Sequence, residues 1–128
     1  MAVRYVLDAS ALLCLINAEP GVDIVRSALA DSVIGAVNLS EVVAKIVERG
    51  VTALTASAIL DPLHLPVVEF DRALAVAAGA LRASTRHAGL SFGDRACLAL
   101  AASRGLVALT GDRAWVNCAV DAEIEVFR

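Results

Sequence analysis

Four carboxylates stand at places in this 128-residue chain where a catalytic site could form. Asp8 ends a short β-favouring run, and Asp112 follows a predicted strand by two residues. Glu41 and Asp94 fall in the first turns of predicted helices. Several carboxylates cannot crowd together in ionised form without a counter-charge, and hard oxygen ligands favour Mg²⁺ or Mn²⁺. Because ions held in this way can activate water and stabilise the oxyanions of a phosphodiester displacement, the residues predict metal-dependent hydrolysis.

Each acid also has a structural explanation. Asp is a favoured N-cap residue, so the first and last acids could cap the helices that follow them. Glu41 and Asp94 fit capping boxes with Asn38 and Ser91, three positions before each. Taken singly, each acid is better explained as a cap. A parallel sheet would bring its strand ends to one edge, where ligands bind, and the four acids together favour a site.

Strand and helix patterns alternate along the chain. Short apolar runs between turn residues are typical of buried strands, and a spacing of three and four residues predicts helices. The predicted strands are 3–7, 32–37, 65–70, 106–109 and 124–127. The predicted helices are 9–17, 22–30, 38–49, 52–61, 71–85 and 91–104. We therefore expect one α/β domain over residues 1–128, a three-layer α/β/α sandwich around a mostly parallel sheet of about five strands.

The composition favours a cytoplasmic protein with a protein partner. The hydrophobic fraction is 59%, above the roughly 45–50% of a typical globular domain. No apolar run approaches the ~18 residues of a membrane span, and the start of the chain lacks the features of a signal peptide. The three cysteines, Cys14, Cys97 and Cys118, have no zinc-ligand spacing and are interpreted as small buried hydrophobes in a reducing compartment. The surplus apolar surface predicts contact with another protein.

Several helices carry more apolar surface than one buried face requires. The predicted helices 9–17, 22–30, 42–49 and 52–60 are apolar over more than one stripe. The surplus fits a partner helix lying in a groove. It equally fits helices that are well covered in a compact sandwich.

Basic residues give a weaker indication. The net charge of −3 argues against a general nucleic-acid coat protein. Ten of the eleven basic residues are arginine, a side chain suited to bidentate phosphate contacts. Those in the C-terminal third that are candidates for such contacts are Arg82, Arg86, Arg95 and Arg113.

Four segments of the chain carry a family resemblance: residues 6–12, 38–42, 89–101 and 109–113. They resemble the PIN-domain ribonucleases of the VapC type, the toxic half of a bacterial toxin–antitoxin pair. They occur in the family's order and spacing and span nearly the whole chain. The block from Gly89 to Ala101, together with Thr110-Gly111-Asp112, is the most specific part.

The resemblance implies an acidic pocket that binds Mg²⁺ or Mn²⁺. Asp8 and Asp94 would be direct ligands, and the other two acids would bind a second ion or hold waters. Ser10 and Thr110 would support the ligands through hydroxyl contacts. The family cleaves RNA, often structured tRNA or ribosomal RNA, so the four arginines become candidate RNA contacts. The resemblance also implies a homodimer or a toxin–antitoxin hetero-oligomer. The cognate antitoxin would silence the nuclease by placing a segment in an apolar groove.

Two other functions compete with a nuclease. A phosphatase of the haloacid-dehalogenase type needs an acid two residues after its nucleophilic Asp, and Ser10 occupies that place. A non-catalytic PIN-like binding module would be expected to have lost at least one acid, yet all four are present. Nucleotide-binding glycine loops are absent, and neither His64 nor His87 has the context of a nucleophile's base. His64, between two leucines, is predicted to be partly buried.

Overall fold

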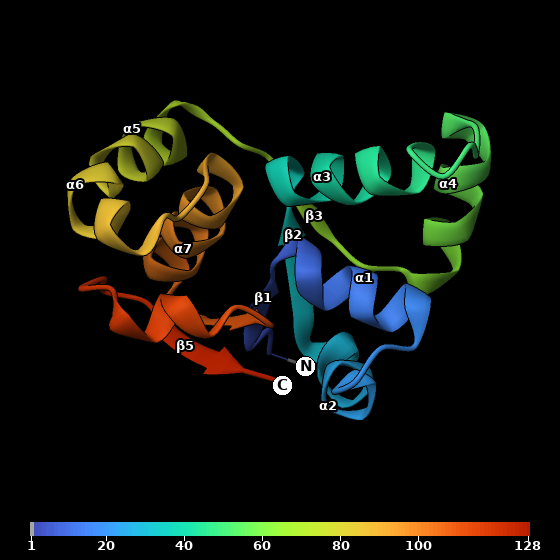
Figure 1. Cartoon of the computed structure of the whole chain (residues 1–128), viewed down its shortest axis with the longest axis horizontal. Coiled ribbons are helices and arrows are strands. Elements are labelled where there is room, and N and C mark those ends of the chain that lie inside the picture. The colour runs from blue at the N-terminus through green and yellow to red at the C-terminus, as the bar shows by residue number, and fades with distance from the viewer. Residues whose placement is uncertain (1) are drawn as a thin grey trace.

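A sheet of five parallel strands organises the computed structural model, which describes residues 2–128 (Figure 1). The strands are β1 Tyr5–Leu7, β2 Ser32–Gly35, β3 Val67–Val68, β4 Val107–Thr110 and β5 Glu123–Val126. Their order across the sheet is β3-β2-β1-β4-β5, and each neighbouring pair is parallel. The chain reaches β1 first and adds strands on both sides of it, so the ends of β1 and β4 lie side by side.

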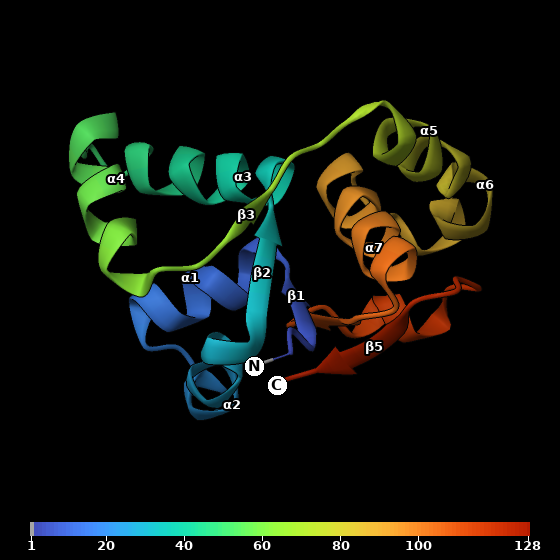
Figure 2. The ribbon, with the colours of Figure 1, turned by 180° about the vertical axis from the view of Figure 1, so that it is seen from behind.

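Within residues 2–128, seven α-helices cover the two faces of the sheet. They are α1 Ala9–Asn17, α2 Val22–Ala28, α3 Ala36–Val47, α4 Ala53–Leu60, α5 Arg72–Ala80, α6 Arg82–Thr85 and α7 Phe92–Arg104. Helices α1 to α4 lie on one side of the sheet and α5 to α7 on the other, as the two opposite views show (Figures 1 and 2). The predicted three-layer α/β/α sandwich is confirmed, and the sheet is parallel throughout.

Alternate residues of the buried strands point to opposite layers. Val6 and Ala108 pack with α5 and α7, whereas Leu7 and Leu109 pack with α1 and α2. Both faces are therefore apolar, as expected for a covered parallel sheet. Helix α7 is buried along most of its length and packs against both α5 and α3. It also packs against the three central strands β1, β2 and β4.

The start of α3 differs from the sequence prediction. The strand β2 ends at Gly35, and the helix begins at Ala36 rather than at Asn38. Gly35 is the N-cap and has no side chain to mark the boundary, so the apolar residues after it resemble a continuing strand. The predicted capping box of Asn38 and Glu41 is wrong, and Glu41 lies in the second turn rather than the first.

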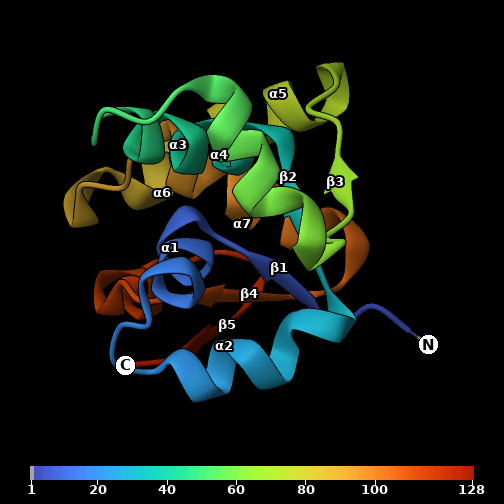
Figure 3. The ribbon, with the colours of Figure 1, turned by 90° about the vertical axis from the view of Figure 1, so that its right-hand side faces the viewer.

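Smaller differences concern β3, the helix after it and one histidine. The predicted strand 65–70 contains only two residues in the sheet, and the predicted helix 71–85 is divided into α5 and α6. His64 is exposed in a left-handed turn, not partly buried. Cys14 and Cys97 are buried as predicted, and Cys118 is half-buried. Viewed from the side (Figure 3), the helices of residues 2–128 are short, and none has the length and apolar character to cross a membrane.

Candidate active site

The first acid, Asp8, lies between the end of β1 and the start of α1. Its Oδ1 accepts hydrogen bonds from the Ala11 N–H at 2.8 Å and from the Ser10 hydroxyl at 2.7 Å. Its Oδ2 accepts one from the Thr110 hydroxyl at 2.6 Å. Asp8 is therefore both the N-cap of α1 and the centre of a polar network, and it is only 5% exposed. Helix capping accounts for the bond from the Ala11 N–H. It does not account for the two hydroxyl donors, which suit a functional carboxylate.

The loop after β4 joins the same network. The Gly111 N–H donates to the Ser10 hydroxyl at 2.9 Å, and the Asp112 N–H donates to the Thr110 hydroxyl at 3.0 Å. The Asp112 carboxylate accepts from the Ala114 N–H at 2.9 Å and caps a short 3₁₀ helix. The side chains of Ser10 and Thr110 thus connect Asp8 to the loop that carries Asp112.

The third acid, Asp94, stands in the first turn of α7. Its Oδ2 accepts from the Ser91 N–H at 2.9 Å, and its own N–H donates to the Ser91 hydroxyl at 3.2 Å. The capping box predicted for these residues is confirmed. Because the box uses only Oδ2, Oδ1 accepts no hydrogen bond from residues 2–128.

Glu41 reaches the site from the second turn of α3. The Asn38 amide donates to Glu41 Oε1 at 2.9 Å and to the Gly93 carbonyl at 3.0 Å. A Cβ atom at Gly93 would overlap the Glu41 carboxylate, so a larger residue at this position would force that carboxylate to move. Sequence reasoning assigned no role to Gly93. A glycine in the first turn of a helix, without a turn to explain it, is the signal that could have identified it.

Three of the carboxyl groups have a raised pKa. Burial is the main cause of the raised pKa of Asp8, Glu41 and Asp94. The charge of Asp94 adds to the rise for both Asp8 and Glu41, and the charge of Asp112 adds to the rise for Asp94. In the described residues, none of the four acids forms a salt bridge. The site concentrates negative charge that no salt bridge neutralises, which favours a cation.

The donor set fits a hard divalent ion. Within residues 2–128, no three or more His, Cys, Asp or Glu side chains are gathered closely enough to enclose a metal. Mg²⁺ does not need such a cage, because it keeps several waters and binds through one or two carboxylates. Asp94 Oδ1 and Glu41 Oε2 accept no hydrogen bond in the described chain and could serve as such ligands.

The predicted arginine contacts separate into two groups. Arg95 is partly buried, and its guanidinium donates to the Ala78 carbonyl at 3.0 Å and lies 6.0 Å from the Phe92 ring centroid. It therefore holds α7 against α5. Arg82 and Arg86 are exposed around α6. The side chains of Arg82 and Arg86 are therefore accessible to a polyanion such as RNA.

Two arginines lie beside the loop that carries Asp112. Arg113 is exposed, and its Nε donates to the Arg128 carbonyl at 3.0 Å. The Arg128 guanidinium lies against Gly111 and forms a salt bridge with Glu19 at 2.7 Å. Sequence reasoning missed Arg128, because its distance along the chain from the other basic residues gave no sign of this contact.

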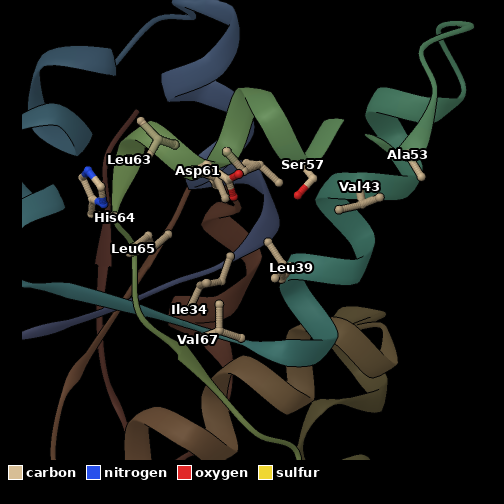
Figure 4. A pocket seen from close by; sticks show the side chains of 12 residues that line it. Ile34, Leu39, Val43, Ala53, Ser57, Asp61, Leu63, His64, Leu65 and Val67 are labelled. Carbon is tan, nitrogen blue, oxygen red and sulfur yellow. The ribbon is translucent and has the colours of Figure 1, made fainter. Parts of the chain in front are cut away.

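A separate apolar groove lies between α1, α3, α4 and β3 (Figure 4). It encloses about 390 Å³. The side chains of Leu39, Val43 and Leu65 form part of its wall, and Asp61 and His64 stand among the few polar groups. None of the four acids lines it. The groove and the acidic site are distinct features of the chain.

Comparisons with known proteins agree with this architecture. The PIN domain family model matches residues 5–120. Among solved structures, the DNA-bound VapBC of Salmonella typhimurium is similar, with 21% identity, a TM-score of 0.77 and coverage of 98% of this chain and 99% of that one. VapBC2 of Rickettsia felis, bound to a promoter DNA fragment, has 16% identity, a TM-score of 0.77 and coverage of 98% and 100%.

A third similar structure is PAE2754 of Pyrobaculum aerophilum. It has 25% identity and a TM-score of 0.63, with coverage of 97% of this chain and 92% of that one. No curated protein sequence matches the chain. Since the family model covers residues 5–120 of the 128, the chain belongs to the PIN domain family, and the fold agrees with that of the similar structures.

Proposed function

We propose that this protein is a metal-dependent endoribonuclease of the VapC type, the toxin of a toxin–antitoxin pair. One observation carries the proposal: carboxylates from four segments gather at one edge of the sheet and have no salt-bridge partner in the described chain, and burial together with neighbouring acids raises the pKa of Asp8, Glu41 and Asp94. Membership of the PIN domain family supports it. The substrate would be structured RNA such as tRNA or ribosomal RNA.

Each acid has a role in this proposal. Asp8 and Asp94 would bind Mg²⁺ or Mn²⁺, and Glu41 and Asp112 would hold a second ion or metal-bound waters. Such an ion supplies Lewis-acid stabilisation of the phosphate oxygens and lowers the pKa of water. The hydroxyls of Ser10 and Thr110 fix both Asp8 oxygens, so its carboxylate needs little reorganisation to bind a ligand.

RNA would reach the acids along the exposed arginines. Arg113 and Arg128 lie beside the loop of Asp112, and Arg82 and Arg86 add exposed positive charge on α6 and the turn after it. Guanidinium groups suit phosphate contacts, and they would offset the repulsion between an acidic site and a polyanion. A non-catalytic binding module would need only these arginines, so the unpaired carboxylates favour the nuclease.

The groove between α3 and α4 would receive the antitoxin. Its wall is apolar and it lies outside the acidic site, which suits the apolar face of a partner helix. The similar structures from Salmonella typhimurium and Rickettsia felis are VapBC complexes, which supports a partner of this kind. Homodimer formation, a toxin–antitoxin hetero-oligomer and a cytoplasmic location belong to the same proposal.

RNA cleavage tests the proposed activity. Purified, antitoxin-free protein is incubated with total tRNA and ribosomal RNA in Mg²⁺, in Mn²⁺ and in EDTA, beside the Asp94→Ala variant. We expect discrete fragments that need a metal and disappear with Asp94→Ala. Folded wild-type protein that yields no fragments with either metal would contradict the proposal and favour a binding module. Fragments that persist in EDTA and in the variant would identify a contaminating nuclease.

A further inference from the structure

Asn38 is a buried polar side chain that joins the two helices of the acidic site. Asn38 is only 1% exposed, and it lies on the same buried side of α3 as Val42 and Ile46. Its amide nitrogen has two acceptors, Glu41 Oε1 at 2.9 Å and the Gly93 carbonyl at 3.0 Å. The first bond orients an acid, and the second attaches α3 to the residue before Asp94.

Packing alone does not explain an asparagine at this position. Its Oδ1 is buried without a hydrogen-bond partner in residues 2–128, and an unpaired buried acceptor is unfavourable. Asparagine is also a poor residue for a helix interior compared with leucine or alanine. The benefit must come from the two bonds that its amide donates. Both of them act on the acidic site.

The bond to Glu41 selects which oxygen remains available. Asn38 occupies Oε1, while Oε2 accepts no hydrogen bond from residues 2–128. The absence of a Cβ atom at Gly93 lets the carboxylate sit against the first turn of α7, next to Asp94. Asn38 thus restrains Glu41 from one side and the α7 backbone from the other.

We propose that Asn38 is a positioning residue that holds the Glu41 carboxylate in its metal-binding orientation beside Asp94. It acts through Glu41 and needs no contact with the ion or the RNA. The inference rests on the proposed function for the identity of the ion. It predicts that removing Asn38 weakens Mn²⁺ binding only while Glu41 has a carboxylate to orient.

The test is a double-mutant cycle on the full chain, read by calorimetric titration with Mn²⁺. The variants are Asn38→Ala, Glu41→Gln and the pair together. We expect Asn38→Ala to raise the Kd for Mn²⁺ about tenfold, the lower end of the effect of losing an outer partner of a ligand. In the Glu41→Gln background the same change should alter the Kd less than about twofold. Equal effects in the two backgrounds would overturn the inference.

Two further variants separate positioning from folding. Ile46→Val truncates a buried neighbour on the same side of α3 and should lower the melting temperature without changing the Kd. Asn38→Leu keeps the approximate shape of the side chain without its two donors and adds no charge, and it replaces Asn38→Ala if that variant does not fold. We expect Asn38→Leu to bind Mn²⁺ at least tenfold more weakly, and wild-type affinity would overturn the inference.

The RNA assay distinguishes failure of this inference from failure of the proposed function. Wild-type protein that cleaves RNA while Asn38→Leu matches it in Kd and rate would refute the role of Asn38 alone. Wild-type protein that neither binds Mn²⁺ nor cleaves RNA would refute the proposed function and the inference with it. Mn²⁺ binding that depends on Asn38 in a protein without RNA cleavage would support the positioning role while contradicting the nuclease.

Discussion

The acidic site and the apolar groove lie on two sides of the same helix. Glu41 of α3 faces the acids, whereas Leu39 and Val43, two residues away on either side, line the groove. Residues two apart point in nearly opposite directions on a helix, and residues four apart share a face. One region has surplus negative charge and the other has surplus apolar surface. The separation predicts that the proposed catalysis and the proposed partner binding can be altered independently, although α3 contributes residues to both regions.

The largest expected effect comes from neutralising one acid, which should reduce RNA cleavage without changing antitoxin binding. Asp94→Asn keeps an oxygen for the Ser91 N–H but removes the charge. We expect RNA cleavage to fall about 10³-fold, because an ion contributes several kcal/mol to transition-state stabilisation. Binding of the antitoxin in the groove should be unchanged. A variant that cleaves at more than a tenth of the wild-type rate would contradict the role of Asp94.

A charge in the groove should have the opposite effect, weakening antitoxin binding while leaving RNA cleavage nearly unchanged. Val43→Lys places an ammonium group on the apolar wall, where an antitoxin segment would have to desolvate it. We expect the affinity for the antitoxin to fall at least tenfold and RNA cleavage to stay within twofold of wild type. Calorimetry with the antitoxin and the RNA assay measure the two quantities. Unchanged affinity would place the antitoxin elsewhere.

Two helical glycines provide a matched pair for the packing of the acidic site. At Gly93 a Cβ atom would overlap the Glu41 carboxylate, whereas at Gly79 it would meet nothing within 4 Å. Gly93→Ala should lower cleavage about tenfold by displacing Glu41. Gly79→Ala should leave cleavage unchanged and stabilise α5 by about 0.5–1 kcal/mol. Equal cleavage by both variants would show that the close approach at Gly93 has no functional importance.

The smallest expected effect is on the pH dependence of stability without metal. The raised pKa of Asp94 means that folded protein holds more protons than unfolded protein between the ordinary value of 3.8 and the raised one. The contribution of Asp94 to the free energy of unfolding therefore falls as pH rises through this window. Asp94→Asn removes it, so without metal the variant should melt above wild type at pH 7.

The difference in melting temperature should vanish as pH falls below the ordinary Asp value, where both forms are uncharged at this position. Saturating Mn²⁺ should reverse the order at pH 7, because only wild type retains the ligand. A variant that melts below wild type across the whole pH range would show that the charge of Asp94 is compensated in the folded protein.

Much of this contrast could be predicted from the sequence. The alternation of strands and helices gave the layers, and residues such as Ser91 and Asp94 form local hydrogen bonds that spacing alone reveals. The order β3-β2-β1-β4-β5 and the contact of α3 with α7 depend on long-range packing. The boundary of α3 was misplaced because Gly35 and the apolar residues after it fit a strand as well as a helix.

The contact between Asn38 and Gly93 could not be predicted, because it depends on long-range packing. The bond from Asn38 to the Gly93 carbonyl spans 55 residues, so local spacing suggested only a helix cap. The surplus apolar surface of several helices fits either a partner groove or well-covered helices, and the family resemblance alone implies a groove. Its lining comes from α1, α3, α4 and β3 together. Hydrogen bonds between residues close in sequence can be predicted from their spacing, whereas a surface lined by several helices and a strand can be described only when the fold is known.

The central claim is that the four acids form one metal centre. The most direct measurement is the anomalous scattering of Mn²⁺ in crystals of the protein grown with that ion. We predict a Mn²⁺ peak in ligand contact with Asp8 and Asp94, near Glu41 and Asp112, and its disappearance in crystals of Asp94→Asn. Crystals saturated with Mn²⁺ that show no peak among these four carboxylates would contradict the claim.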